Sequence, residues 1–428
     1  MARIVLNTFG SLGDLHPYLA LAIELRRRGH DAVIATSEVY RQKIVAEGVA
    51  FTPVRPDVGL LANNPGLVRR LWDPLRGSEA LFRDYLIPQI EDSYEDLFSA
   101  CRGADLLLTH IAGLAGPIVA EQLELRWLSI ALQPIVFFSS YDPPVLSGFE
   151  WARRFYPFGP GVFQALMAAA RLRFKRWAHP IQRLRRRLGL STWKTDLLVN
   201  TFSPRGTLAL FSKWFAAPQP DWPPRTHITG FIYYDRLGAI SDAQEDDPAE
   251  LDDFLRSGPP PLLFTLGSSV VMDAGDFFQE SIVAAHALGL RAVLVAGGRR
   301  NEIHNPLPDS ILVAGYVPFS RIMPHALAIV HQGGIGTTAQ ALRAGRPMLV
   351  APWGHDQPDN AERLRRLGAA RTIPRTRYYA PRVTNELRAL LADPSYEECA
   401  RALAGGIAHE DGLASACDAI EAALRNAG

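Results

Sequence analysis

The residues with the clearest chemical potential lie in one stretch, 331–360, with the sequence HQGGIGTTAQALRAGRPMLVAPWGHDQPDN. A short apolar strand ends at His331, and a glycine-rich turn follows it and opens a helix that we expect to start at Thr337–Thr338. Free N–H groups and the dipole at a helix N-terminus favour a phosphate, and glycines let a ligand approach the backbone closely. The turn predicts a phosphate site with His331 as an added donor. For the glycines alone, an ordinary turn of a Rossmann-like domain is an equally good interpretation.

The same stretch ends with an acid and an amide. Asp356 and Gln357 follow the apolar run Pro347–Trp353, so they should lie at the carboxyl end of a strand. A carboxylate and an amide can hydrogen-bond the paired hydroxyls of a sugar. These two residues therefore predict a sugar site beside the phosphate site.

A second loop, Gly10–Pro17 (GSLGDLHP), lies between the first strand and the first helix. It departs from G-x-G-x-x-G, which argues against a dinucleotide oxidoreductase. Asp14 on this loop can be a helix cap, or it can be a base that deprotonates a bound hydroxyl. His110 ends the run DLLLTH, where it could contact Asp14, contact an acceptor or simply line a cleft.

Alternating strands and helices must position these residues. In the first half the predicted strands are Arg3–Phe9, Asp31–Ala35, Ala50–Val54, Asp105–Thr109 and Arg126–Leu132, and Pro17 suits the first turn of a helix. In the second half they are Pro261–Gly267, Arg291–Gly297, Ile311–Val317, Ala326–His331 and Pro347–Trp353. The alternation predicts an α/β protein with two Rossmann-like halves, and ligands bind at the carboxyl ends of such strands.

The domain borders follow from length and composition. A chain of 428 residues suits two domains of roughly 200 residues each. We predict a first domain over 1–235, a second over 236–405 and a helix within 406–428 that packs back on the first domain. The hinge should fall near the proline-rich bend Pro218–Pro224 and the acidic stretch Ser241–Asp253.

Overall composition excludes several classes. The net charge of +1 selects neither nucleic acid nor an acidic partner. Three cysteines indicate a reduced protein without a disulfide framework, and no Cys/His cluster suggests a metal. The N-terminus lacks the apolar core of a signal peptide, and no apolar run is long enough to span a membrane. We therefore expect a cytoplasmic protein.

The whole 331–360 string resembles the donor-binding signature of family 1 glycosyltransferases, which have the GT-B fold of two Rossmann-like domains facing across a cleft. The resemblance implies that the diphosphate of a nucleotide-sugar is held by His331, Gly333, Gly334, Gly336 and Thr337, and the sugar by Asp356 and Gln357. Further donor contacts are implied at Ser11, Gly13, Gly267, Ser268, Tyr316, Val317 and Trp353. The plant signature carries a glutamate for the ribose, whereas this helix offers only Thr338, Ala339 and Gln340. That departure makes a deoxyribose donor such as a dTDP-sugar more plausible than in the plant enzymes.

The same resemblance assigns a base. In this family a G-[His or Asp]-x-x-Pro loop carries it, and Asp14 matches that position. Asp14, with His110 beside it as a second catalytic candidate, would then deprotonate an acceptor hydroxyl, which attacks the anomeric carbon with inversion. No D-x-D pair for a diphosphate-bridging metal occurs in the chain, so we expect no cofactor beyond the nucleotide-sugar.

A closer similarity concerns the acceptor. The segments 71–74 (LWDP) and 214–223 (WFAAPQPDWP) resemble the rhamnosyltransferase chain of bacterial rhamnolipid synthesis and related flavonoid glycosyltransferases. This resemblance implies a hydrophobic acceptor, either a lipid hydroxy acid or a phenol. The proline–tryptophan string itself we interpret as interdomain packing. An apolar wall for the acceptor is predicted, with core packing as the alternative for each residue, from Ile135, Phe137, Phe138, Phe149, Trp151, Phe155, Tyr156, Phe158 and Phe163.

Between Glu150 and Asp196 the chain has eleven Lys or Arg and no acid. The basic residues of 171–187 form either a solvated face or a contact with an anionic membrane, to which each would add roughly 1 kcal/mol. Two other functions stay open: a nucleotide-sugar 2-epimerase, which needs no acceptor, and a non-catalytic subunit that binds a nucleotide-sugar.

Overall fold

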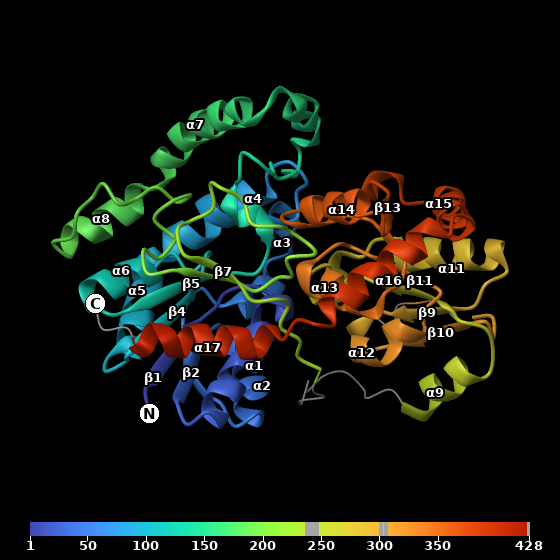
Figure 1. The fold of residues 1–428 in the computed structure, drawn as a ribbon, viewed down its shortest axis with the longest axis horizontal. Coiled ribbons are helices and arrows are strands. Elements are labelled where there is room, and N and C mark those ends of the chain that lie inside the picture. The colour runs from blue at the N-terminus through green and yellow to red at the C-terminus, as the bar shows by residue number, and fades with distance from the viewer. Residues whose placement is uncertain (236–247, 299–302, 304–306, 426–428) are drawn as a thin grey trace. The chain divides into compact units, whose positions relative to one another are not determined.

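The computed structural model describes residues 1–235, 248–298, 303 and 307–425 (Figure 1). Its contacts divide the chain into two compact units: unit 1 is Met1–Tyr234 with Asp411–Gly428, and unit 2 is Asp235–Glu410. The sequence-based borders were 235/236 and 405/406. Of the predicted hinge Ser241–Asp253, residues 241–247 lie outside the described residues, and the remainder falls in a helix, α9 (Pro248–Arg256).

Unit 1 contains a seven-stranded parallel sheet in the order β3-β2-β1-β4-β5-β6-β7. The strands are β1 (Arg3–Asn7), β2 (Asp31–Thr36), β3 (Ala50–Pro53), β4 (Leu106–His110), β5 (Trp127–Ala131), β6 (Thr207–Ala209) and β7 (Thr226–Ile228). The first five coincide with the predicted strands. The last two were not predicted, because three residues carry no detectable alternation.

The helices of unit 1 are α1 (Leu12–Arg27), α2 (Arg41–Ala46), α3 (Pro65–Leu71), α4 (Gly77–Ala80), α5 (Ile90–Cys101), α6 (Gly116–Gln122), α7 (Pro160–Trp177), α8 (His179–Arg187) and α17 (Gly412–Arg425). The placement of Pro17 in a first turn was wrong. Helix α1 begins at Leu12 with Ser11 as its N-cap, and Pro17 lies inside it. The core between the sheet and α5 and α6 is apolar, with Leu97, Leu107 and Val119 fully buried.

The proline–tryptophan string packs inside unit 1. The Trp222 ring lies 4.5 Å from Phe137 and 5.8 Å from Phe211, centroid to centroid. Asp221 accepts hydrogen bonds from the Ser139 hydroxyl and the Ser140 N–H, both at 2.6 Å. For these residues the interdomain interpretation was wrong: they pin the loop after β5 to the segment before β7.

Unit 2 contains a six-stranded parallel sheet in the order β10-β9-β8-β11-β12-β13. Its strands are β8 (Leu262–Thr265), β9 (Ala292–Val295), β10 (Ile311–Ala314), β11 (Ala328–His331), β12 (Met348–Val350) and β13 (Ala370–Thr372). Besides α9, its helices are α10 (Gly267–Val270), α11 (Phe277–Leu288), α12 (Phe319–Ile322), α13 (Ile335–Ala344), α14 (Gln357–Arg366), α15 (Ala380–Ala392) and α16 (Ser395–Ile407). The prediction of an α/β protein with two Rossmann-like halves is confirmed.

Helix α17 returns to unit 1 and packs along α1 (Figure 1). Arg28 of unit 1 donates to the Asp418 carboxylate at 2.5 Å, and the His30 ring lies 3.3 Å from Glu421. A side chain at Gly412 would collide with the carbonyl oxygen of Phe231, so a glycine is needed where the helix begins. Within the described ranges, no helix has the length and apolar character needed to cross a bilayer.

Candidate functional site

The N-terminus of α1 is closed by its own side chains. Ser11 is the N-cap and its hydroxyl accepts the Gly13 N–H at 3.2 Å. One carboxylate oxygen of Asp14, Oδ2, accepts the Ser11 N–H at 2.7 Å and the Ser11 hydroxyl at 3.1 Å, which completes a capping box. Asp14 is therefore a structural cap, as one of the two interpretations held, and its other oxygen, Oδ1, stays outside the box.

Gly10 is the residue that makes room for this carboxylate. A Cβ there would collide with Asp14 Oδ2, and Gly10 has a φ of +134°, which L side chains rarely adopt. The Gly10 carbonyl also accepts the Tyr40 hydroxyl at 2.8 Å. No role was predicted for Gly10. The available signal was a glycine four residues before an acid on a loop that leads into a helix.

Asp14 and His110 come together at the carboxyl ends of β1 and β4. His110 Nε2 lies 4.0 Å from Asp14 Oδ1, which is too long for a hydrogen bond. His110 Nδ1 accepts the Ala112 N–H at 3.3 Å, so the neutral ring carries its proton on Nε2. This Nε2 is buried and has no hydrogen-bond partner among the described residues. The ring is thus held with a free N–H beside the carboxylate.

The electrostatics of this pair favour a basic carboxylate. Burial raises the pKa of Asp14 above its usual value, while His110 and the Ser11 hydrogen bonds partly oppose that rise. Burial also lowers the pKa of His110, against the pull of Asp14. The Asp14 side chain is still 24% exposed, so a substrate hydroxyl can reach it. A carboxylate with a raised pKa is a stronger proton acceptor than a solvated one.

In unit 2 the N-terminus of α13 is left open. Its N-cap is Gly334, which provides no side chain, and the helix starts at Ile335, two positions before the predicted Thr337. The first N–H groups of an α-helix have no partner within the helix, and here Gly336 is exposed in that first turn. The Gly333 N–H is bound to His331, so the free N–H groups at the carboxyl end of β11 are those of Gly334–Gly336.

His331 contributes a second unsatisfied donor at the same place. The side chain is fully buried, and its Nδ1 accepts the Gly333 N–H at 3.0 Å. The proton of the neutral ring is then on Nε2, which is buried without a hydrogen-bond partner among the described residues. Burial lowers the pKa of His331 to about 3, so the ring stays neutral at physiological pH.

Two predicted donor-binding residues, Gly267 after β8 and Thr337 after β11, lie close together. A Cβ at Gly267, after β8, would lie 3.1 Å from the Thr337 hydroxyl and 2.5 Å from the amide nitrogen of Gln332. Gly267 has a φ of +61°, and Ser268 beyond it is exposed. The structure thus brings Gly267 and Thr337 together, and Gln332 joins them although it was not predicted.

Gln357 and Trp353 make contacts within unit 2 that hold the loop after β12. The Gln357 side-chain oxygen accepts the N–H groups of Trp353 at 2.8 Å and Gly354 at 3.3 Å, so only its amide nitrogen is left for a sugar. Trp353 is 3% exposed, with its ring 5.8 Å from that of Phe277. A Cβ at Gly333 would lie 3.1 Å from the Gln357 carbonyl, which places the sugar and phosphate candidates side by side.

Asn360 links these elements and was missed. Its side-chain nitrogen donates to the Gly333 carbonyl at 2.9 Å and to Asp356 Oδ2 at 2.7 Å, and the residue is fully buried. Asn360 therefore orients both the glycine turn and the sugar candidate. The available signal was its spacing of four residues from Asp356, which places both on one face of α14.

Tyr316 and Val317 follow β10. Tyr316 is half-buried, and burial, followed by the charge of Asp235, raises its pKa. Val317 is 6% exposed. The Asp235 carboxylate also accepts Gln340 at 2.8 Å and Arg343 at 3.0 Å. Gln340, one of three residues at the position of the plant glutamate, is therefore engaged within the protein.

The acceptor candidates differ in how far they are exposed. Phe137 is buried, 5.6 Å from Phe202 and 4.5 Å from Trp222, so its ring belongs to the core, as the alternative interpretation held. Ile135 and Phe138 on the same loop are partly buried. Phe149 and Phe155 are 50% and 41% exposed.

The basic segment is partly neutralised. Arg185 is 2% exposed and pairs with Glu121 at 2.8 Å, so a fully solvated face was wrong for this residue. Arg187 pairs with Glu91 at 2.9 Å, and Arg171 with Asp196 at 3.7 Å. The segment therefore contains both structural and free cations.

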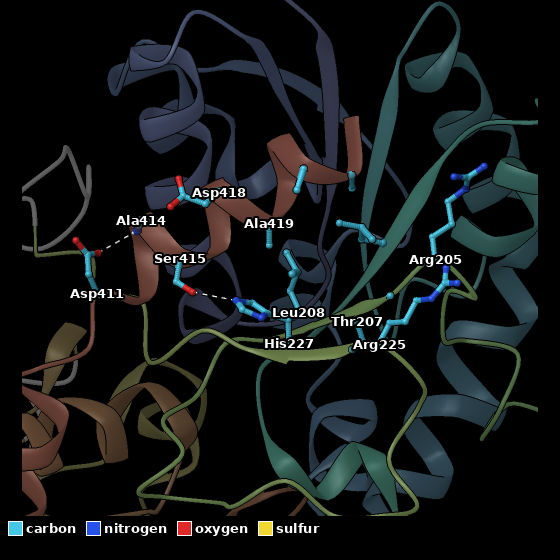
Figure 2. Close-up of a pocket in the computed structure, with 14 residues that line it drawn as sticks. Arg205, Thr207, Leu208, Arg225, His227, Asp411, Ala414, Ser415, Asp418 and Ala419 are labelled. Atoms are coloured by element: carbon cyan, nitrogen blue, oxygen red, sulfur yellow. Dashed lines mark hydrogen bonds between the residues drawn. The ribbon is translucent and has the colours of Figure 1, made fainter. Parts of the chain in front are cut away.

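A separate groove of about 770 Å³ lies in unit 1, between β6, β7 and α17 (Figure 2). The His227 ring donates to or accepts from the Ser415 hydroxyl at 3.0 Å across it, and Arg205 and Arg225 lie toward one end. None of the predicted site residues lines this groove. Among the described residues no group of three or more His, Cys, Asp or Glu side chains is arranged to hold a metal.

Comparisons with known proteins agree with this arrangement. Residues 4–130 match the glycosyltransferase family 28 N-terminal domain, and residues 284–417 match the erythromycin biosynthesis protein CIII-like C-terminal domain. The chain is 32% identical over 432 residues to O-mycaminosyltylonolide 6-deoxyallosyltransferase of Streptomyces fradiae, covering 98% of this chain and 97% of that protein.

Two further proteins are similar to this chain. The chain is 28% identical over 380 residues to a sterol 3-beta-glucosyltransferase of Glomerella lagenarium, covering 83% of this chain but only 24% of that longer protein. A solved spinosyn rhamnosyltransferase complexed with thymidine diphosphate superposes with a TM-score of 0.69 at 19% identity, covering 98% of this chain and all of that one, which shows a shared fold. The chain belongs to the family of the Streptomyces enzyme: it is a GT-B glycosyltransferase that moves a sugar from a nucleotide-sugar to an acceptor.

Proposed function

We propose that this glycosyltransferase moves a sugar from a dTDP-sugar to the hydroxyl of a hydrophobic acceptor, with inversion at the anomeric carbon. The observation that carries the proposal is the open N-terminus of α13, with the buried and unpartnered Nε2–H of His331 at the same place. An unsatisfied buried donor is costly, and a bound oxyanion would satisfy it. Free N–H groups and the helix dipole add to that preference for an anion.

The diphosphate would take this anion position. Thr337, Gly334 and Gly336 supply backbone or hydroxyl donors, and Gly267 leaves room where a side chain would crowd Thr337. As the donor reacts, charge develops on the leaving diphosphate, and fixed donors stabilise that charge without reorganising. Asp356 and the amide nitrogen of Gln357 would orient the sugar next to it.

The base of the nucleotide is proposed to be thymine. At the position of the plant glutamate, Thr338 and Ala339 are buried and Gln340 is bound to Asp235, so this helix offers no acid for a ribose. A solved relative of the same fold is described as complexed with thymidine diphosphate, and the Streptomyces relative is named for a 6-deoxyhexose. The donors to compare are dTDP-rhamnose, dTDP-glucose and UDP-glucose.

Asp14 is the proposed base. Its Oδ1 takes the proton of the acceptor hydroxyl, the oxygen attacks the anomeric carbon, and the bond from that carbon to the diphosphate oxygen breaks. His110 is a positioning residue in this scheme: its Nε2–H faces the same carboxylate from 4.0 Å. The sugar leaves one oxygen and joins another on the opposite face, so the configuration inverts.

The acceptor is proposed to be apolar. The names of two relatives specify a sterol and O-mycaminosyltylonolide. The similarity to rhamnolipid and flavonoid enzymes adds lipid hydroxy acids and phenols as the classes to test first. An acceptor of lipid type would reach a cytoplasmic enzyme at a membrane, so peripheral contact with an anionic bilayer is part of this proposal.

Metal independence is also part of the proposal. Backbone N–H groups and His331 would balance the diphosphate charge that a D-x-D-bound cation balances in other glycosyltransferases. Turnover should therefore be unchanged when EDTA replaces added Mg²⁺. Loss of turnover on EDTA treatment, restored by Mg²⁺, would remove this part of the scheme.

The deciding experiment measures donor binding by calorimetry with dTDP-rhamnose, dTDP-glucose and UDP-glucose, followed by transfer to hydroxy fatty acids and flavonoids. His331→Ala should weaken binding of the preferred donor by roughly tenfold or more, because a hydrogen bond to a charged group is lost. His286→Ala, an exposed histidine of the same unit, is the matched control and should bind normally. Equal binding by the two variants, or release of an epimerised nucleotide-sugar without acceptor, would contradict the proposal.

A further inference from the structure

Residues 149–187, here named the aromatic–basic arm, expose an unusual amount of apolar surface. Four aromatic side chains at its start are 41–74% exposed: Phe149, Trp151, Phe155 and Phe158. Their rings follow one another at centroid distances of 6.3, 6.0 and 6.4 Å. Contiguous exposed aromatics are rare on a free protein surface, and they indicate a surface that is covered in use.

Helix α7 extends this apolar surface. On its inner side Phe163 and Met167 are 5% and 8% exposed. Its outer side is also apolar but uncovered, with Leu172 66% exposed and Ala165, Ala168 and Ala169 exposed around it. Figure 1 shows α7 running along the outer edge of unit 1 and leading into α8. A helix with a second apolar side has something other than its own core to contact.

The charge beside that surface is of one sign. Lys175, Arg176, Arg183 and Arg186 are exposed, and none forms an ion pair with a described residue, unlike Arg185 and its paired neighbours. No acid occurs between Glu150 and Asp196 to balance them. Protein segments that lie in the interface of anionic bilayers typically combine exposed aromatic rings with unpaired cations.

We propose that the aromatic–basic arm docks this protein on an anionic lipid surface. The aromatic side chains and the outer side of α7 would enter the headgroup region, and the four free cations would contact lipid phosphates. The proposal extends the proposed function by naming where a lipid acceptor is met, but it depends only on this surface. A second copy of the chain fits less well, because a symmetric contact would bring the same cations together.

The test is co-sedimentation of the full chain with vesicles of phosphatidylglycerol and phosphatidylcholine (30:70) and with pure phosphatidylcholine. The wild-type chain should bind the anionic vesicles, and binding should weaken as salt is raised. Replacing the four free cations with Gln should lower the partition coefficient by about tenfold or more. The double variant Trp151→Ser/Phe158→Ser should lower it as well.

Matched controls lie elsewhere on the chain. Trp214→Ser changes a tryptophan that is 47% exposed outside the arm, and Arg388→Gln changes an exposed arginine of unit 2. Both should bind vesicles as the wild type does. Each variant is also checked for dTDP-sugar binding in vesicle-free solution, which depends on unit 2 and separates this proposal from the proposed function.

Three outcomes would overturn the proposal. The first is absence of binding to anionic vesicles, whatever the donor binding. The second is binding that neither arm variant weakens. The third is a stable dimer in light scattering that the arm variants dissolve, because the arm would then be an interface between copies.

Discussion

Helices α1 and α13 both begin at the carboxyl end of a buried parallel strand, but their N-termini are treated in opposite ways. The first turn of α1 is satisfied from within by Ser11 and the Asp14 carboxylate. The first turn of α13 has a glycine at the N-cap and no side-chain cap, with an unpartnered histidine N–H nearby. One helix thus carries its own anion and the other is left without one.

Under the proposed function, the N-terminus of a helix serves as the support of a base in α1 and as an anion site in α13. In the proposed scheme, a carboxylate that belongs to the chain, held at a helix start and partly buried, serves as the base. In the same scheme, a helix start without a carboxylate binds the diphosphate of the donor, an anion that arrives and leaves with each turnover. Exchanging these properties between the two helices is the most direct way to test the comparison.

The largest effect should follow Asp14→Asn. The amide preserves the shape of the capping box but accepts no proton, so turnover should fall by about 10³-fold while donor binding is retained. Because burial raises the pKa of Asp14 in the folded protein, the ionised carboxylate costs folding free energy at neutral pH, and the melting temperature of Asp14→Asn should stay equal or rise. Asp31→Asn, at a more exposed carboxylate of the same unit, is the control. Full turnover by Asp14→Asn would exclude Asp14 as the base.

The next effect should follow Gly10→Ala. Its new methyl group must displace Asp14 Oδ2, so turnover should fall by about 10²-fold, as expected for a misplaced catalytic group. Gly29→Ala is the matched control, since Gly29 also has a positive φ, +87°, but no atom within 4 Å of its new Cβ. That variant should lose only about 1 kcal/mol of stability and keep its turnover. If both variants lose turnover equally, backbone strain and not the displacement of Asp14 is responsible.

A smaller effect tests the open helix directly. Gly334 has a φ of −61° and a ψ of 143°, so its backbone allows an Asp that would cap α13 with the chain's own carboxylate. A Cβ there would lie 2.7 Å from the side-chain nitrogen of Gln332, so the end of that side chain must move in any Gly334 variant. Gly334→Asp should weaken donor binding by about tenfold, because two anions would compete for the same N–H groups. Gly334→Ser supplies a neutral cap and should weaken the donor less. Unchanged donor affinity in Gly334→Asp would place the diphosphate elsewhere.

The smallest effect concerns pH. Asp14 must be ionised to accept a proton, so kcat/KM should fall as the pH drops through its raised pKa. His110 lowers the pKa of Asp14, so His110→Gln should raise that pKa further and move the acid limb to higher pH. His227→Gln, at an exposed histidine of the same unit, should leave the limb in place. A limb that moves to lower pH would show that His110 acts on Asp14 in another way.

The sequence was sufficient for the long apolar strands, whose burial on both faces leaves a continuous signal. It was insufficient for β6 (TLA), β7 (THI) and β13 (ART), because each is a three-residue strand that contains polar residues. The equally short β12 was predicted because it lies in the apolar run Pro347–Trp353. The start of α1 was misplaced because Pro17 was given more weight than the Ser11–Asp14 capping pattern. Here a local hydrogen-bond signal was more informative than the proline.

For the site, the sequence motifs predicted that Gly267 and Thr337 both contact the donor. The two residues lie close together because β8 and β11, which precede them, are neighbours in the sheet. The roles of Asn360 and Gly10 were not predicted. Asn360 acts through a hydrogen bond to the Gly333 carbonyl, and Gly10 acts by leaving space for the Asp14 carboxylate, so both roles depend on the three-dimensional structure. Phe137 shows the reverse error: an aromatic residue in an irregular segment resembles a pocket wall until its neighbours Phe202 and Trp222 are known.

Helix α17 has a consequence for biosynthesis. Residues 411–425 complete unit 1, yet a ribosome makes them only after the whole of unit 2. During translation Arg28 keeps Glu24, but Arg28 and His30 lack their carboxylate partners on α17, and the Phe231 carbonyl lacks its contact with Gly412. Unit 1 is thus the first to be synthesised and the last to be finished, so its nascent form is the one that needs protection from aggregation.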